Sequence, residues 1–364
     1  MLNTDTLRQL ADLAAPERAF LTVYLDDGDD RSVLDSRWER IRSLLADQPE
    51  ETQHFEESLG LAEALLVANS PPTGGALAVY CSWGADLGTA FELPAPVGTM
   101  AWMGAAPYVR PAYELLDEHE TFAVAVVDNT RAKIYVVTAS DVEEEASVRG
   151  DVKNSVKKGG WSQKRYARRR EKELSRYAQD IADALADVDA ASPFARLVLL
   201  GSEETIQSVQ QALRTDLADK VVGAEAASTA DSEAELVEQA AALADQGERA
   251  EERALWDEIR EQGLSGTLSS FGATDVLETV HAARAEALLV DREAEFAGTK
   301  CRACEHVLHG ATDTCGQCGS SDVFHTDLVE HLTQEAMRTG ATVDFADPFP
   351  ALTQAGGVAA LLRY

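Results

Sequence analysis

Several things are scarce in this chain: it has no apolar run of about 18 residues, the length that a membrane-spanning helix needs, and only 6% of its residues are aromatic. Its N-terminus also lacks the charged-then-apolar order of a secretory signal peptide. We therefore expect a cytoplasmic protein that does not enter membranes. The 364 residues are 45% hydrophobic, enough to form real cores in two or three domains.

Basic residues are also in short supply, with 32 Lys and Arg against 63 Asp and Glu and a formal net charge of -31. This composition is typical of a halophilic cytoplasm, where molar salt screens charges to within about 3 Å. We interpret the acidity as adaptation to that solvent and not as an interaction surface. Because salt weakens phosphate contacts steeply, a nucleic-acid site in this chain needs dense positive charge.

The chain has only five cysteines, so we do not expect a framework of disulfide bonds. Cys81 stands alone in an apolar run and is expected in the core. The other four form two Cys-x-x-Cys pairs separated by ten residues: Cys301, Cys304, Cys315 and Cys318.

Two such pairs have the spacing of a zinc ribbon, expected over residues 299–323. Each pair brings two thiolates to one face of a tight turn, and four thiolates close a tetrahedral shell around Zn²⁺. A closed shell leaves no open position for catalysis, so the predicted zinc is structural. His306, His309 and His325 lie nearby in sequence, and we expect them to be surface residues and not ligands.

Against this acidic background, residues 153–172 hold nine Lys and Arg and one acid. Without this segment the chain has 23 basic and 62 acidic residues. Such a local excess predicts a polyanionic partner, RNA first. The residues predicted to bind RNA are Lys157, Lys158, Lys164, Arg165, Arg168, Arg169 and Lys172.

Inside the segment lies the sequence Gly159-Gly160-Trp161-Ser162-Gln163, which we predict to be a flexible loop. The two glycines allow close approach to a substrate backbone, and Ser162 can cap the following helix. An amide cannot remove a proton at neutral pH, so Gln163 would orient an attacking water or stabilise an oxyanion. Taken alone, the loop is better interpreted as one that only contacts phosphate.

Strand and helix patterns alternate along the chain, which indicates a mixed α/β (α+β) protein. We expect three domains, at residues 1–118, 119–245 and 246–364, with an acidic helix over 232–262 near the second boundary. The middle domain should contain a long helix after the basic loop. Its apolar stripe is Tyr166, Leu174, Tyr177, Ile181, Leu185 and Val188.

Together these features resemble the class I peptide-chain release factors of archaea and eukaryotes. In that family a Gly-Gly-Gln tip precedes a basic helix, and here Gly159 and Gly160 are followed by Ser162, Arg165, Tyr166 and Arg168 in the family's pattern. The ending over residues 356–364 looks like the family's glycine-containing Leu-Arg-Tyr ending. The resemblance covers residues 119–364 closely and 1–118 loosely, and implies a three-domain architecture with a zinc ribbon inserted in the C-terminal domain.

The chain departs from that pattern at the tip, where Trp161 replaces the glutamine and glutamine returns as Gln163. Residues 1–118 contain neither an Asn-Ile-Lys-Ser tip nor a Tyr-x-Cys-x-x-x-Phe element. A displaced glutamine is similar to that of the divergent Vms/Ankzf-type peptidyl-tRNA hydrolases of ribosome quality control.

The resemblance implies a codon-independent peptidyl-tRNA hydrolase that frees nascent chains on stalled ribosomes or large subunits. Gln163 would position the nucleophile, Gly159 and Gly160 would admit the ester, and the arginines would hold rRNA and the tRNA acceptor end. Some relatives cut the tRNA near its 3′ end, and the sequence leaves that reaction open. A stop-codon release factor and a non-catalytic Pelota-like adaptor are the alternatives, and the C-terminal domain would dock a protein partner, as it does in the family.

Overall fold

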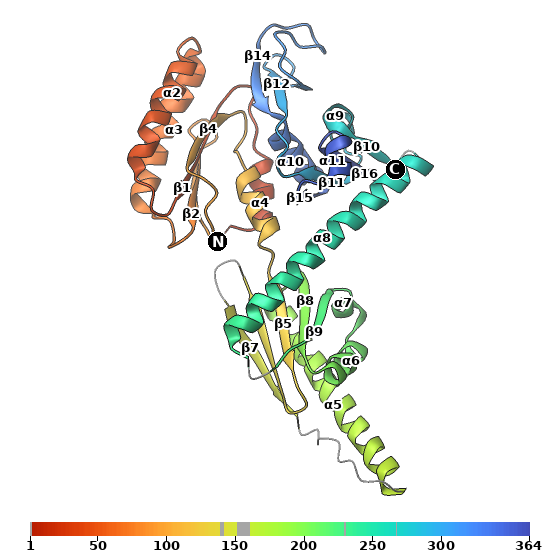
Figure 1. The fold of residues 1–364 in the computed structure, drawn as a ribbon. Coiled ribbons are helices and arrows are strands. Elements are labelled where there is room, and N and C mark those ends of the chain that lie inside the picture. Colours follow the sequence, from red (N-terminus) through yellow and green to blue (C-terminus); the bar gives the residue numbers. More distant parts are fainter. Residues whose placement is uncertain (1, 139–141, 151–160, 229–230, 267) are drawn as a thin grey trace. The chain divides into compact units, whose positions relative to one another are not determined.

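The computed structural model describes residues 2–138, 142–150, 161–228, 231–266 and 268–364, with the backbone alone for residues 161–167. Contacts divide the chain into two compact units. We call residues 1–118 with 252–364 the terminal unit, and residues 119–251 the middle unit (Figure 1). The α/β fold class is confirmed, and the division into three domains stays a prediction. None of the described helices is both long enough and apolar enough to span a membrane.

The first part of the terminal unit is a four-stranded antiparallel sheet of order β3-β2-β1-β4 with helices on both faces. Its elements are α1 Thr4–Ala11, β1 Phe20–Asp26, η1 Arg31–Leu34, α2 Asp35–Leu45, α3 Pro49–Ala68, β2 Ala76–Ser82, β3 Leu87–Leu93, β4 Met100–Gly104 and α4 Arg110–Glu118. Along β1, Leu21 and Val23 pack with α2 and α3, whereas Tyr24 packs with α1 and α4. Cys81 on β2 is fully buried, as expected.

Prolines mark the ends of two elements in this part. Helix α2 ends at Leu45, and α3 starts at Pro49. Proline fits the first helical turn, where its missing N–H costs nothing. Strand β3 ends at Leu93, and the prolines at 94 and 96 follow it.

The second part of the terminal unit is a sheet of order β10-β16-β11-β15 with a separate three-stranded ribbon, β13-β12-β14. Its elements are α8 Glu233–Ser265, shared with the middle unit, β10 Ser269–Phe271, α9 Gly272–His281, β11 Ala285–Asp291, β12 Ala297–Cys301, β13 Val307–His309, β14 Val323–Asp327, α10 Leu328–Thr339, β15 Thr342–Ala346, α11 Pro350–Gln354 and β16 Val358–Leu362. Helices α9 and α10 cover one face, and α11 with the end of α8 covers the other. The C-terminal ending is thus a central strand, β16.

A buried carboxylate joins the two parts of the terminal unit. Glu330 on α10 is 5% exposed and accepts the backbone N–H groups of Val109 (2.8 Å) and Arg110 (2.7 Å), where α4 begins. Gln334 donates a third hydrogen bond to it. Burial raises the pKa of Glu330 to about 8, although the backbone N–H groups of Val109 and Arg110 act in the opposite direction. At neutral pH the folded protein therefore holds a proton that the unfolded chain releases.

The wild type should lose stability relative to Glu330→Gln as pH rises from about 5 to 8. In that range the folded state binds one proton more than the unfolded state, so the free energy of unfolding falls by up to about 1.4 kcal/mol per pH unit. Urea unfolding of both proteins at several pH values measures the difference. Glu335→Gln on the same helix should follow the wild type, and a constant difference between wild type and Glu330→Gln would contradict the raised pKa.

The middle unit is a five-stranded mixed sheet of order β7-β6-β5-β8-β9. Its elements are β5 Phe122–Val127, β6 Arg131–Val137, β7 Val142–Arg149, α5 Trp161–Ala191, β8 Arg196–Gly201, α6 Glu203–Ala212, α7 Thr215–Ala218, β9 Val221–Ala226 and the first part of α8. Strand β5 pairs parallel to β8 and antiparallel to β6. Strand β7, whose acidic residues gave no strand signal, extends the edge beside β6.

Helices cover both faces of this sheet and make three layers (Figure 1). Ala123 and Ala125 of β5 face α5 and α6, while Val124 and Val126 face α8. The predicted apolar stripe of α5 is confirmed from Leu174 to Val188, all of whose members are buried. This packing directs the opposite face of α5 to solvent.

Candidate functional site

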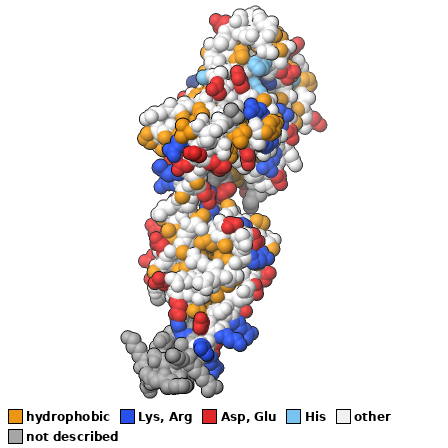
Figure 2. Space-filling model, turned by 90° about the vertical axis from the view of Figure 1, so that its right-hand side faces the viewer, with side chains coloured by type: hydrophobic (Ala, Val, Ile, Leu, Met, Phe, Trp, Pro, Cys, Tyr) orange, Lys and Arg blue, Asp and Glu red, His pale blue; other side chains and the backbone are white. Residues whose placement is uncertain are grey.

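Helix α5 carries the basic face that the sequence predicted. It begins at Trp161, so Gln163 belongs to the first helical turn and not to a loop. Arg168, Arg169 and Lys172 are exposed on the side opposite the buried stripe. Figure 2 shows Lys and Arg side chains gathered at this end of the middle unit, beside the residues that are not described.

Two arginines of this helix are engaged by acids. Arg169 donates to Glu173 one turn later, at 2.9 Å. Arg170 makes two hydrogen bonds to Glu204 and joins α5 to the start of α6. Those hydrogen bonds hold the pKa of Glu204 below its ordinary value. Within the part of the chain that the structure describes, Arg168 and Lys172 have no ion-pair partner, which leaves their charge available to a ligand.

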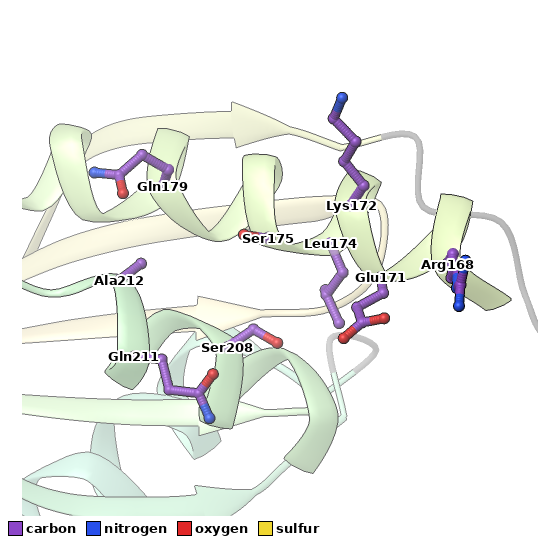
Figure 3. Close-up of a pocket in the computed structure, with 9 residues that line it drawn as sticks. All are labelled: Arg168, Glu171, Lys172, Leu174, Ser175, Gln179, Ser208, Gln211 and Ala212. Atoms are coloured by element: carbon purple, nitrogen blue, oxygen red, sulfur yellow. The ribbon is translucent and has the colours of Figure 1, made fainter.

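A shallow groove between α5 and α6 continues from these two cations. Figure 3 shows Lys172 pointing to the opposite side of α5 from Glu171. The groove is lined by Arg168, Glu171, Lys172, Leu174, Ser175 and Gln179 of α5 and by Ser208, Gln211 and Ala212 of α6. Its hydroxyl and amide groups can both donate and accept hydrogen bonds, as ribose and phosphate groups require.

Several predicted site residues cannot be placed. Lys157, Lys158, Gly159 and Gly160 lie outside the described residues. The side chains of Gln163, Lys164 and Arg165 are likewise outside the description, although their backbone belongs to α5. The roles of these residues in RNA binding and catalysis stay predictions.

The four cysteines meet in the ribbon, where their Sγ atoms all lie within 4.8 Å of one another. The Sγ atoms of Cys301 and Cys318 are 3.6 Å apart, as are those of Cys304 and Cys315. A tetrahedral site with metal–sulfur bonds of about 2.3 Å places its sulfurs about 3.8 Å apart. The cluster therefore fits a four-thiolate metal site, as its spacing predicted.

The ribbon is connected to the N-terminal sheet by Arg302, which follows the first cysteine. Arg302 donates to Glu51 of α3 at 2.6 Å, and Arg18 donates to the other oxygen of Glu51 at 3.1 Å. Both guanidinium groups stack on the Phe324 ring of β14, at 4.5 and 4.4 Å. Burial acts to raise the pKa of Glu51, but the hydrogen bonds from Arg18 and Arg302 hold it below the ordinary value.

Replacing Glu51 by alanine should lower the free energy of unfolding by about 3–5 kcal/mol, because it leaves two partly buried guanidinium groups without their carboxylate. Chemical unfolding followed by tryptophan fluorescence measures the loss. The matched control is Glu56→Ala on the same helix, whose pair with Arg42 is more than 40% exposed on both sides. That change should cost no more than about 1 kcal/mol. Equal losses in the two variants would contradict this account.

The histidines only partly follow expectation. His309 and His325 are exposed, as predicted, but His306 is half-buried beside His281, with ring centroids 5.4 Å apart. His281 in turn meets His331 of α10. Neither this group nor Glu51 and Glu330 was singled out from the sequence. These partners come from separate elements far apart along the chain, so they leave no periodic signal in the sequence.

Comparison with known proteins gives sequence matches along most of the chain. Peptide chain release factor subunit 1 of Methanococcoides burtonii is 24% identical over 323 residues, covering 79% of this chain and 78% of that protein. The protein of the same name from Thermococcus onnurineus is 24% identical over 285 residues, covering 70% and 69%. These matches support a relationship of the chain to the archaeo-eukaryotic class I release factor superfamily.

Within that superfamily, residues 107–245 match the family model described as bacterial archaeo-eukaryotic release factor family 10. This match spans the middle unit as far as the first part of α8, including helix α5. Among solved structures, Dom34 of Saccharomyces cerevisiae is 13% identical with a TM-score of 0.45, covering 80% of this chain and 79% of that one. The relationship to the superfamily rests on the sequence matches.

Proposed function

We propose that this protein is a codon-independent peptidyl-tRNA hydrolase that acts on stalled ribosomes or large subunits. Its relationship to the superfamily supports a ribosome-associated role in translation. The observation that carries the finer proposal is the position of Gln163 in the first turn of α5, two residues after its place in release factors and shortly before the exposed cations Arg168 and Lys172.

In this proposal Gln163 orients a water molecule toward the ester carbonyl of peptidyl-tRNA. The water oxygen bonds to the carbonyl carbon, the bond to the terminal ribose oxygen breaks, and that oxygen takes up the proton that the water loses. The products are a free peptide carboxyl and a tRNA hydroxyl. Gln163 takes no proton, because an amide is too weak a base. The first four backbone N–H groups of an α-helix have no acceptor inside the helix, so those at the start of α5 can stabilise the developing oxyanion.

Positive charge on α5 would hold the RNA. In this proposal Arg168 and Lys172 contact phosphate, and further positive charge for RNA binding comes from Lys157, Lys158, Lys164, Arg165 and Arg169. Gly159 and Gly160 let the backbone approach the ester. Cleavage of a phosphodiester near the tRNA 3′ end is the second candidate reaction, in which Arg165 or Arg168 would stabilise the negative charge on the oxygens of the phosphorane.

The metal of the four-cysteine cluster is Zn²⁺ in this proposal, held by Cys301, Cys304, Cys315 and Cys318. Four thiolates around one Zn²⁺ leave no open coordination position, so the ion rigidifies the ribbon and takes no part in hydrolysis. The ribbon is in turn held to α3 by the hydrogen bond from Arg302 to Glu51. The docking of a protein partner on residues 246–364 stays a prediction.

The test uses large subunits that carry labelled peptidyl-tRNA and no messenger RNA, incubated with the full chain in molar KCl. Peptide release with an intact tRNA 3′ end supports ester hydrolysis, whereas a shortened 3′ end supports the phosphodiester reaction. Release that occurs only on complete ribosomes with a stop codon would replace the proposal with a termination factor. Binding without any release would replace it with a Pelota-like adaptor.

A further inference from the structure

Three of the seven histidines meet in the terminal unit, from three separate elements. His281 ends α9, His331 lies in the first turn of α10, and His306 stands between β12 and β13 of the ribbon. The Nε2 atoms of His281 and His331 are 2.8 Å apart, and their ring centroids are 5.1 Å apart. The centroids of His281 and His306 are 5.4 Å apart. The Nε2 atoms of His281 and His331 therefore face each other, with the His306 ring beside them.

The protonation state of His281 and His331 suits metal binding. Burial, and to a smaller extent neighbouring histidines, lowers the pKa of His281 and lowers that of His331 to about 3. Both rings are thus neutral at neutral pH, and a neutral imidazole offers one nitrogen lone pair to a metal. Without a metal, one Nε2 must carry a hydrogen and donate it to the other.

The distances agree with shared coordination. In a tetrahedral site with metal–nitrogen bonds of about 2.0–2.1 Å, two ligating nitrogens lie about 3.3 Å apart and their ring centroids about 5.2 Å apart. The observed centroid distances of 5.1 and 5.4 Å are close to that value. The nitrogens lie 2.8 Å apart in a nearly straight hydrogen bond, so both rings must turn and separate slightly to admit an ion.

We propose that His281, His331 and His306 form a second metal site, for a divalent transition metal of the Zn²⁺ class. Imidazole is a preferred ligand of Zn²⁺, Ni²⁺ and Cu²⁺. His281 and His331 supply the two facing nitrogens, and a turn of the His306 ring about its Cβ–Cγ bond supplies the third. Water completes the shell, which distinguishes this site from the closed cysteine cluster.

Charges around the three rings are balanced. Lys300 and Arg338 oppose a cation near this site, and Glu335, one turn after His331 on α10, favours it. Arg338 is itself paired with Glu335. The metal would tie the first cysteine turn of the ribbon to α9 and α10, since the backbone C=O of His306 accepts the N–H of Cys301 at 3.0 Å. This inference does not depend on the proposed hydrolase activity.

Metal content of the full chain tests the site. Metal-free protein is titrated with Zn²⁺ near pH 7.5, and the number of ions bound per chain is counted by calorimetry and by elemental analysis after gel filtration. We expect two per chain in the wild type and one in a His281→Asn, His331→Asn double variant. His309→Asn and His325→Asn remove exposed histidines outside the site and should leave two.

Cobalt distinguishes the two kinds of ligand. After one equivalent of Zn²⁺ has filled the cysteine cluster, a following equivalent of Co²⁺ should bind without the thiolate-to-metal charge-transfer band. The single variant His281→Asn changes a surface residue at a helix end and serves if the double variant unfolds. One Zn²⁺ per chain in the wild type, or a second ion that survives His281→Asn with unchanged affinity, would show that the three rings form only a hydrogen-bonded cluster.

Discussion

Alanine in place of Gln163 is expected to slow peptide release from large subunits by about 10²–10³-fold, the usual cost of removing one group that stabilises or positions the transition state. Binding to the subunit should be nearly unchanged, because the cations of α5 remain. Single-turnover release at saturating protein measures the rate, and co-sedimentation measures the binding. Gln210→Ala on α6 is the matched control, because it removes an exposed amide of the middle unit that does not line the groove.

For the cations of α5 we expect the reverse: weaker binding to the subunit with little change in the release rate. Arg168→Ala and Lys172→Ala should weaken binding, and each should lower the slope of log K against log salt by about one unit if its cation binds one phosphate. The release rate at saturating protein should stay near that of the wild type for Lys172→Ala. Release unaffected by Gln163→Ala would remove this residue from the reaction and leave the loop as a phosphate-binding segment.

Loss of the cysteine cluster should have the largest effect on stability. Binding of a structural Zn²⁺ supplies about 10–16 kcal/mol of apparent free energy at neutral pH, most of which folds the surrounding segment. Replacing Cys315 and Cys318 by serine should therefore unfold residues 299–323 and release Arg302 from Glu51. Hydrogen exchange mapped along the chain should show reduced protection in the ribbon and near α3, with the middle unit unchanged.

Cys81→Ala provides the control for this variant. The Cys81 thiol is fully buried in the N-terminal sheet, where burial raises its pKa to about 12. Its removal should lower stability through poorer packing while the metal content stays that of the wild type. A ribbon that keeps its protection and its thiolate-bound metal after replacement of Cys315 and Cys318 would overturn the four-thiolate assignment.

The sequence predicted those parts of the site that depend on local spacing. Two Cys-x-x-Cys turns carry their own geometry, and the structure brings all four sulfurs together as expected. The 3.6-residue period of the apolar stripe in α5 determined which face would be buried, and thereby exposed Arg168 and Lys172. Both predictions need only the covalent chain and one regular secondary structure.

Other expectations failed where local signals compete. The glycines before Trp161 indicated a loop that extends to Gln163, yet the helix begins earlier and takes Gln163 into its first turn. The acids of β7 gave no strand signal, yet β7 pairs with β6, and Lys133 of β6 forms an ion pair with Glu144 of β7. Edge-strand pairing is decided by the neighbouring strand, so composition alone did not reveal it.

The sequence by itself determined the α/β class, the metal-binding cysteines and the basic face of the long helix, because each follows from periodicity or short spacing. Only the tertiary structure decided that Glu51 joins Arg18 to Arg302, that Glu330 receives the N–H groups at the start of α4, and that His281 meets His331. These groups come together because packed sheets and helices bring distant segments within hydrogen-bonding distance. Burial then alters their protonation, which no local pattern in the chain records.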